Sequence, residues 1–158
     1  MIRIETDGGV RVVTLDRAEK RNALTPGMLD DLVAALKAGG KERRDGVEAR
    51  PTREMETRAI LLRGEGRVFC AGFDLDLCRD DGPEQGVMRS FLDGLSAAIR
   101  AMRGADCPVV VAAHGAAIAG GCALLGGADF VVADRGAKLG YPVVRLGISP
   151  AVSAPFLI

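Results

Sequence analysis

The sequence predicts an α/β layered fold. Short runs typical of strands alternate along the chain with longer runs that carry an apolar stripe at helical spacing. One run, PVVVAAHG at residues 108–115, is apolar up to its histidine. A continuous apolar run of this kind is typical of a strand buried on both faces of a sheet. The sequence shows no internal repeat and no low-complexity tract, so we expect these elements to pack in layers.

The first two elements are expected to be a hairpin and a helix. Residues 2–17 alternate apolar and polar side chains around an Asp-Gly-Gly turn, and glycine tolerates the positive φ of a tight hairpin. Next, Thr25 can cap a helix that begins at Pro26, and the Gly39-Gly40 pair can end it. The stripe that this helix would bury consists of Leu29, Leu32, Val33 and Leu36.

The later elements repeat the alternation of strands and helices. Residues 59–72 predict a buried strand, a turn and a second short strand, followed by a helix from about Asp74. Residues 85–108 predict a long amphipathic helix, and residues 122–142 predict a short helix, a strand and a turn. The apolar side of the long helix consists of Val87, Phe91, Leu95, Ile99 and Met102.

Composition excludes several classes of partner. The chain has 158 residues, 48% of them hydrophobic and 27% charged, which fits one globular domain with a real core. Basic and acidic residues number 21 each, so no net field would attract nucleic acid or an acidic membrane surface. Aromatic residues make up only 4% and tryptophan is absent, so base-stacking platforms are also not expected.

The cysteines argue against a metal site. The four cysteines form no C-x-x-C pair, and His114 is the only histidine. Because the sequence shows neither an amino-terminal signal peptide nor an apolar run long enough to span a bilayer, we expect a cytoplasmic protein with free thiols. Residues 41–58 are almost wholly polar with mixed charge, and we expect them to form a charged surface insertion.

Two glycine-containing segments could bind the same ligand. Residues 109–127 (VVVAAHGAAIAGGCALLGG) and 68–77 (VFCAGFDLDL) each run from an apolar strand into glycine at the start of a helix. Such a start leaves backbone N–H groups pointing outward, and two of them aimed at one point would polarise a carbonyl and hold an oxyanion or enolate. Each site alone also suits close packing or a flexible turn.

Two other classes of enzyme fit poorly. The dinucleotide pattern G-x-G-x-x-G is missing at both glycine sites, and no P-loop lysine follows them. A serine hydrolase would need His114 to serve one of four serines without a G-x-S-x-G motif, so it ranks third among the hypotheses. The four serines are Ser90, Ser96, Ser149 and Ser153.

Four ordered segments resemble the crotonase superfamily of enoyl-CoA hydratases and isomerases. They are LDRAEKRNALTPGMLDDL, AILLRGEGRVFCAGFDL, PVVVAAHGAAIAGGCALLGGADFVVA and AKLGYPVVRLGISPA. The resemblance implies a crotonase-like (ClpP/crotonase) spiral of β-β-α units that binds an acyl-CoA thioester and assembles into homotrimers or pairs of trimers. Family members continue beyond the position of Ile158, so we expect this single domain, residues 1–158, to be incomplete at its carboxyl end.

The resemblance also assigns a site. The backbone N–H groups of Phe73 and Gly120 would form the oxyanion hole of the family. The resemblance implies no separate cofactor, because coenzyme A is part of the substrate. Coenzyme A would lie along two loops and the glycine-rich turn. The residues implied there are Lys20, Arg21, Ala23, Ala71, Gly72, Asp74, Leu75 and Gly121.

The sequence departs from the family at the acid and base positions. Ala123 and Val143 stand where hydratases carry glutamates, and Ala151 stands where some members carry an aspartate, so paired-carboxylate water addition is not expected. Asp76 and Tyr141 are the substitute acid or base candidates. The activity expected is that of a hydratase/isomerase-like lyase or isomerase, or a decarboxylase. The alternative is a non-catalytic acyl-CoA-binding or assembly subunit.

Several of these residues also have a structural interpretation. Asp74 suits a helix cap, and Asp76 suits a solvated helix surface. His114 suits a hydrogen bond at the turn, and Cys122 suits a packed thiol, although a helix start can lower the pKa of a cysteine.

Overall fold

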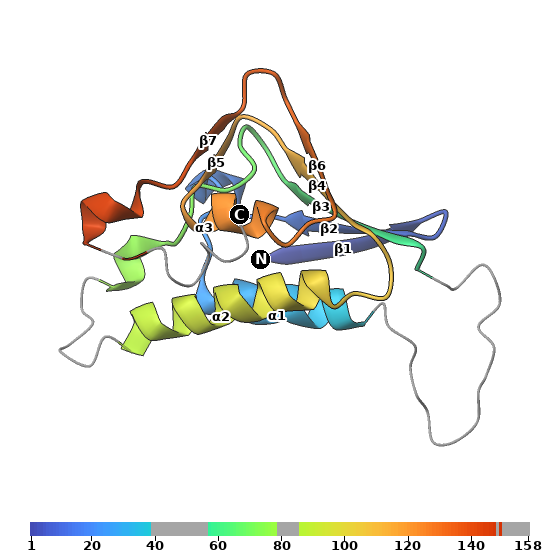
Figure 1. Cartoon of the computed structure of the whole chain (residues 1–158), viewed down its shortest axis with the longest axis horizontal. Helices are drawn as coiled ribbons and strands as arrows, with labels where there is room; N and C mark the ends of the chain where they lie inside the picture. The colour runs from blue at the N-terminus through green and yellow to red at the C-terminus, as the bar shows by residue number, and fades with distance from the viewer. Residues whose placement is uncertain (39–56, 79–85, 148, 150–158) are drawn as a thin grey trace.

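A five-stranded sheet forms one layer of the protein, and its strands lie in the order β1-β2-β3-β4-β6 (Figure 1). The computed structural model describes residues 1–38, 57–78, 86–147 and 149. Only β1 and β2 are antiparallel, and every later pair in this sheet is parallel. The strands are β1 (Ile2–Asp7), β2 (Val10–Leu15), β3 (Ala59–Gly64), β4 (Val109–Ala113) and β6 (Phe130–Ala133).

Two short parallel strands form a second sheet. β5 (Ala116–Ile118) pairs with β7 (Lys138–Gly140). Figure 1 shows this sheet inclined to the larger one, with the short helix α3 (Gly120–Leu125) lying beneath the angle between them. The chain therefore passes from the large sheet to the small one directly after β4.

The predicted hairpin is confirmed. Asp7 pairs with Val10, and the two turn residues Gly8 and Gly9 have φ of 52° and 83°. Two positive φ angles are the requirement of a two-residue type I′ turn, which matches the right-handed twist of the strands. On β2, the side chains of Val13 and Leu15 are fully buried.

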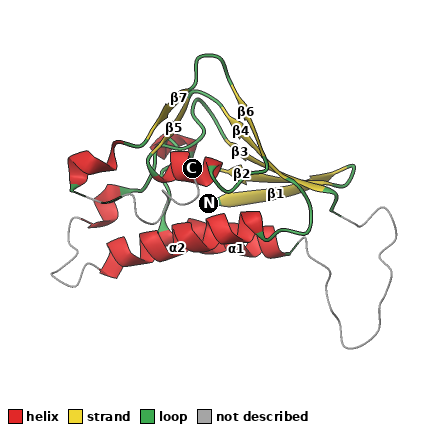
Figure 2. Ribbon diagram, in the orientation of Figure 1, coloured by secondary structure: helices red, strands yellow, loops and turns green. Residues whose placement is uncertain are grey.

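Helices α1 (Pro26–Lys37) and α2 (Gly86–Arg103) lie side by side and cover one side of the sheet (Figure 2). The predicted cap is confirmed, because Thr25 Oγ1 accepts a hydrogen bond from the N–H of Met28 at 3.1 Å. α1 ends at Lys37, and the Gly39-Gly40 pair lies outside the described residues. Among the described residues, no helix is long and apolar enough to cross a membrane.

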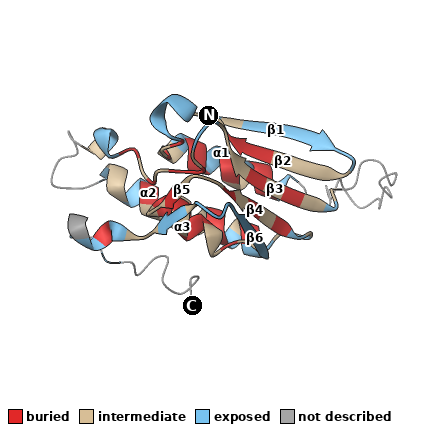
Figure 3. Cartoon of the chain, turned by 90° about the horizontal axis from the view of Figure 1, so that it is seen from above, coloured by how far each residue is buried: buried red, intermediate tan, exposed pale blue. Residues whose placement is uncertain are grey.

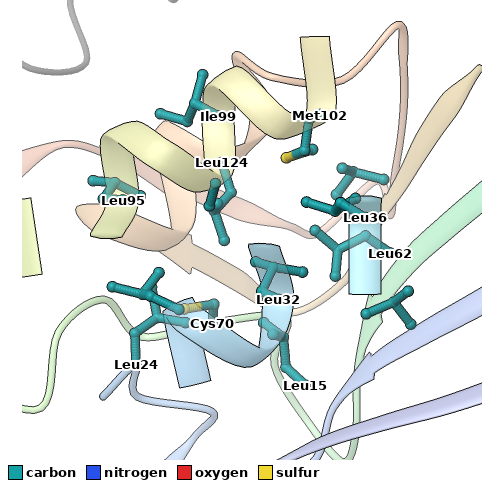
Figure 4. Packing of buried hydrophobic residues seen from close by; sticks show 14 of the residues in the cluster. Leu15, Leu24, Leu32, Leu36, Leu62, Cys70, Leu95, Ile99, Met102 and Leu124 are labelled. Atoms are coloured by element: carbon teal, nitrogen blue, oxygen red, sulfur yellow. The ribbon is translucent and has the colours of Figure 1, made fainter. Parts of the chain in front are cut away.

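The core lies between these helices and the sheet. Figure 4 shows side chains from α1, α2, α3 and the strands pointing into this layer. The predicted stripe of α2 supplies Phe91, Leu95, Ile99 and Met102, all of them buried, whereas Val87 is half-buried. Burial of apolar surface of this kind is the main free-energy gain of folding, at about 25 cal/mol per Å².

Three details of the predicted elements are wrong. The second short strand expected before Gly72 is reduced to one bridge between Cys70 and Ala117. The helix expected from Asp74 begins with the 3₁₀ turn η2 (Leu75–Cys78), and residues 79–85 lie outside the described residues. β5 and β7 were not expected at all, because three-residue strands are too short to show a period. β4 is fully buried on one face and half-buried on the other.

The predicted surface insertion at residues 41–58 lies outside the described residues except for its last two. The edges of the large sheet differ from its middle, as Figure 3 shows. β1 is mostly exposed and polar, whereas all four residues of β6 are exposed and apolar. Phe130 is 62% and Val132 is 63% exposed.

Candidate functional site

Three loops meet where parallel strands of the large sheet end. β2, β3 and β4 run in the same direction, so the segments that follow them emerge at one edge of the sheet. These segments are residues 16–24, residues 65–74 and the connection from β4 through β5 to α3. In open α/β sheets, ligands bind at the carboxyl ends of parallel strands.

The middle loop is held between the other two by main-chain hydrogen bonds. On one side, Leu24 donates its N–H to the Gly72 carbonyl at 2.8 Å, and the Leu24 carbonyl accepts from the N–H of Asp74 at 2.9 Å. On the other side, the N–H of Cys70 bonds to the Ala116 carbonyl at 3.1 Å, and the Cys70 carbonyl accepts from Ile118 at 3.0 Å. The loop therefore has a fixed register against both neighbours.

These hydrogen bonds set the direction of two further N–H groups. In a trans peptide, the C=O and the following N–H point in opposite directions. The Gly72 carbonyl faces Leu24, so the N–H of Phe73 points away from Leu24. The Ala119 carbonyl accepts from the N–H of Ala123 at 2.9 Å, so the N–H of Gly120 points out of the start of α3.

The two N–H groups belong to segments in close contact. A methyl group at Gly72, whose φ is 98°, would lie 3.0 Å from the Ile118 carbonyl oxygen and 3.7 Å from the nitrogen of Gly120. A methyl group at Gly120 would lie 2.9 Å from Cε1 of Phe73. Among the described residues, neither the Phe73 nor the Gly120 N–H donates a hydrogen bond. Both groups can therefore donate to a ligand.

A partly buried ion pair connects the first loop to the middle loop. Arg17 Nη1 lies 2.7 Å from Asp74 Oδ2 and also donates to the Ala23 carbonyl at 3.0 Å. The side chain of Asp74 is 8% exposed, and the hydrogen bond from Arg17 is the main cause that holds the pKa of its carboxyl below the ordinary value. The other carboxylate oxygen accepts from the N–H of Asp76 at 3.3 Å, as a cap of the turn does.

Asn22 holds the main chain of both loops in place. Its buried amide nitrogen donates to the carbonyls of Glu65, Val68 and Phe69 at 2.8, 2.9 and 3.1 Å. Its amide oxygen accepts from the N–H of Arg17 at 2.9 Å. The residue has a φ of 54°, in the left-handed region that asparagine tolerates better than most residues.

Comparison with known proteins now decides the family. The model of the enoyl-CoA hydratase/isomerase family matches residues 5–158. The chain belongs to the enoyl-CoA hydratase/isomerase family. A probable enoyl-CoA hydratase of Rhizobium meliloti is 33% identical over 94% of this chain and 52% of its own length. A putative enoyl-CoA hydratase of Thermus thermophilus is 34% identical over 100% of this chain and 58% of its own.

Solved structures confirm the predicted crotonase-like fold. The Pseudomonas aeruginosa protein AtuE superposes with a TM-score of 0.83 at 31% identity, over 99% of this chain and 56% of that one. An enoyl-CoA hydratase of Mycobacterium smegmatis gives the same TM-score at 27% identity. The chain thus spans about half the length of the family members that it matches.

The residues that the family resemblance assigned to coenzyme A lie together. Ala71 donates its N–H to the Arg21 carbonyl at 3.0 Å, and Lys20 Nζ lies 3.6 Å from Asp76 Oδ2 across the same pair of loops. Leu75 is exposed on η2, and Gly121 is buried against Cys70. The Asp74 carboxylate bonds to Arg17 of the first loop.

The positions that the family resemblance assigns to an acid and a base are apolar in this chain. Ala123 is fully buried and Val143 is 7% exposed, while Ala151 lies outside the described residues. Of the two substitute candidates, Asp76 is exposed on η2. Tyr141 is half-buried directly after Gly140, whose carbonyl accepts from the N–H of Ala119 at 2.8 Å. Tyr141 therefore directly follows the residue that bonds to Ala119, the residue before α3.

The two remaining candidates have structural roles. His114 Nε2 lies 2.9 Å from the Gly66 carbonyl oxygen and donates to it, as predicted for this turn. Burial raises the pKa of the Cys122 thiol, and a hydrogen bond with the main chain of Gly140 opposes that rise only in part. Burial also raises the pKa of Cys70, to about 12. Both thiols are therefore protonated at neutral pH.

Sequence reasoning missed the residues that support this site. Arg17, Asn22 and Phe91 were not expected to take part in it. A signal was available for Arg17 alone, because a polar residue just after a buried strand must find a partner if the chain buries it. No sequence signal would have paired Phe91 with Phe73, which lie on different elements.

Ala119 has a strained backbone at the start of α3. Its φ of 49° and ψ of −114° are rare for any residue except glycine. We predict that Ala119→Gly raises the free energy of unfolding by about 1 kcal/mol, because relief of strain exceeds the entropy cost of glycine. Urea unfolding measures this change. Ala34→Gly, in the exposed interior of α1, is the control and should destabilise by about 1 kcal/mol; equal losses in both variants would contradict the prediction.

Proposed function

We propose that the chain binds an acyl-CoA thioester with its carbonyl oxygen between the N–H groups of Phe73 and Gly120. One observation carries this proposal. Each N–H points away from the residue that its peptide's carbonyl bonds to, and neither N–H donates to an acceptor among the described residues. The two segments that carry these groups are in contact. Two such donors stabilise the negative charge that develops on a thioester oxygen when an enolate forms.

The coenzyme A part of the ligand would lie along the loops at residues 20–23 and 71–75. The main chain joins these loops through the Ala71 N–H and the Arg21 carbonyl. The Lys20 ammonium, which lies 3.6 Å from the Asp76 carboxylate, and the Arg21 guanidinium are exposed at their surface. Cationic side chains of this kind suit the phosphates of coenzyme A. The family membership supports an acyl-CoA ligand.

The reaction proposed is one that needs the enolate but no pair of carboxylates. In the decarboxylation of a malonyl-type thioester, the bond between the α-carbon and the carboxylate breaks and CO₂ leaves. The electron pair then moves into the thioester carbonyl, where the two N–H groups would stabilise it, and the α-carbon later takes a proton. The apolar and buried Ala123 and Val143 favour this step over water addition, which requires carboxylates to move protons.

A pair of variants at position 120 tests the proposal. Both Gly120→Ala and Gly120→Pro add a Cβ against the Phe73 ring, but only proline removes the N–H, and proline suits the first residue of a helix. The measurement is the carbonyl stretching frequency of bound butyryl-CoA that carries ¹³C at the thioester carbon. We expect the largest lowering of the frequency in the wild type and a smaller one in Gly120→Ala, whose Cβ displaces the Phe73 ring but keeps both donors. The smallest lowering is expected in Gly120→Pro, which keeps only the Phe73 donor.

The turnover rates of Gly120→Ala and Gly120→Pro provide a second comparison of the two variants. If the chain processes a thioester, Gly120→Pro should be about 10²- to 10³-fold slower than Gly120→Ala, which is the usual effect of losing one oxyanion donor. Thermal unfolding of both variants shows whether each is folded. A folded Gly120→Pro protein that polarises the carbonyl as the alanine variant does would overturn the assignment.

A second candidate function is a non-catalytic acyl-CoA-binding or assembly subunit. The observation that favours it is the same burial of Ala123 and Val143, which leaves both usual carboxylate positions without a titratable group. Exchange of the α-protons of butyryl-CoA in D₂O, together with a panel of thioesters, separates the two candidates. Binding with no exchange and no turnover supports the subunit, and catalysed release of CO₂ from malonyl-CoA supports the enzyme.

A further inference from the structure

The ring of Phe73 contacts both the long helix and the start of the short one. It stacks on Phe91 of α2, with ring centroids 4.5 Å apart and an interplanar angle of 15°. It also lies against Gly120, where an added Cβ would be only 2.9 Å from Cε1 and 3.2 Å from Cδ1. The ring therefore links Phe91 to the start of α3.

Gly120 has no side chain, and the ring fills the space where one would be. A Cβ at this position would also come within 3.5 Å of Leu24 Cδ1, so the ring and Leu24 together close the space above the helix start. Contacts closer than about 3.0 Å would force one group to move, and the Phe73 ring is already stacked on Phe91. The lack of a side chain at position 120 is thus a packing requirement of the Phe73 ring.

The main chain at Phe73 is held to Leu24. Gly72 has a φ of 98°, and glycine adopts both signs of φ with little preference. The hydrogen bonds of the Gly72 carbonyl and the Asp74 N–H to Leu24 fix the peptide groups on both sides of Phe73, including the one that carries its N–H. The contacts of the Phe73 side chain add a link from this segment to the start of α3.

From these contacts we propose that Phe91 is a positioning residue for the two N–H donors. Phe91 is fully buried on α2, so its ring has little room to move, and it holds the Phe73 ring against Gly120. Because that ring touches the second donor residue, one stack sets both N–H groups relative to each other. This inference rests on the proposed function, since it concerns the geometry of the same carbonyl site.

The test compares two losses of packing on the same helix. Phe91→Leu removes the stacked ring but keeps an apolar side chain, and Phe91→Met does so with a longer, unbranched side chain that can fill an irregular space. Ile99→Ala is the control, because it destabilises the buried side of α2 two turns away from the stack. The probe is the ¹³C-labelled butyryl-CoA described above, and the readouts are its dissociation constant and its carbonyl frequency.

We expect Phe91→Leu and Phe91→Met to reduce the lowering of the carbonyl frequency by at least half, with less than a threefold change in the dissociation constant. Ile99→Ala should keep the full lowering. A wild-type protein that binds the probe without lowering its frequency, or that does not bind it, overturns the proposed function. A wild-type lowering that persists in a folded Phe91 variant overturns the positioning role alone.

Discussion

Replacing Asn22 with alanine is expected to lower the free energy of unfolding by about 3 to 4 kcal/mol. The substitution removes the donor shared by three buried or partly buried carbonyls and the acceptor of the Arg17 N–H. Each buried polar group left without a partner costs about 1 to 3 kcal/mol, and alanine at a φ of 54° adds strain. Urea unfolding monitored by circular dichroism measures the change.

Asn22→Gly separates the two contributions. Glycine loses the same hydrogen bonds but accepts the left-handed backbone, so this variant should be about 1 kcal/mol more stable than Asn22→Ala. If Asn22→Ala unfolds at the wild-type urea concentration, the hydrogen bonds of Asn22 do not hold the two loops together.

The second large effect is expected from Asp74→Asn and depends on pH. Arg17 lowers the pKa of Asp74 in the folded protein, so the folded state favours the charged carboxylate. That contribution is complete above the unfolded pKa of about 3.9 and is lost as the pH falls through the lower folded pKa. At pH 7 the variant should be about 2 to 3 kcal/mol less stable than the wild type, and the difference should shrink toward zero in acid.

Asp76→Asn is the matched control, two residues along the chain. Its carboxylate is 57% exposed and lies 3.6 Å from an exposed lysine, so its removal should change stability by less than about 0.5 kcal/mol at any pH. Free energies of unfolding from urea titrations at a series of pH values give both profiles. A stability loss in Asp74→Asn that stays constant from neutral to acid pH would show that the ion pair is not its cause.

Local patterns were sufficient to predict the elements that carry the core. The cap at Thr25, the stripes of α1 and α2 and the hairpin all depend on side chains within a few residues of one another, so the sequence shows them directly. The family motifs likewise located the two N–H groups, because each motif is a continuous run of residues. The structure then added the hydrogen bonds that determine how those groups point.

What the sequence did not show depends on contacts between distant segments. Asn22 bonds to carbonyls more than forty positions away, and Arg17 pairs with Asp74 across 57. β5 and β7 have only three residues each and are stabilised by pairing with each other, with no periodic pattern of their own. One sequence without aligned relatives contains no signal for such pairs.

Both proposed donors are main-chain groups, and this limits which substitutions can remove them during evolution. At position 73, every coded replacement except proline keeps an N–H, and the peptide that aims it is held through Gly72 and Leu24. The proton-moving positions are side chains, and a single codon change can add or delete a carboxylate there. A lineage can therefore lose one chemistry and acquire another at Ala123 or Val143 while the main-chain groups proposed to bind the carbonyl are inherited unchanged.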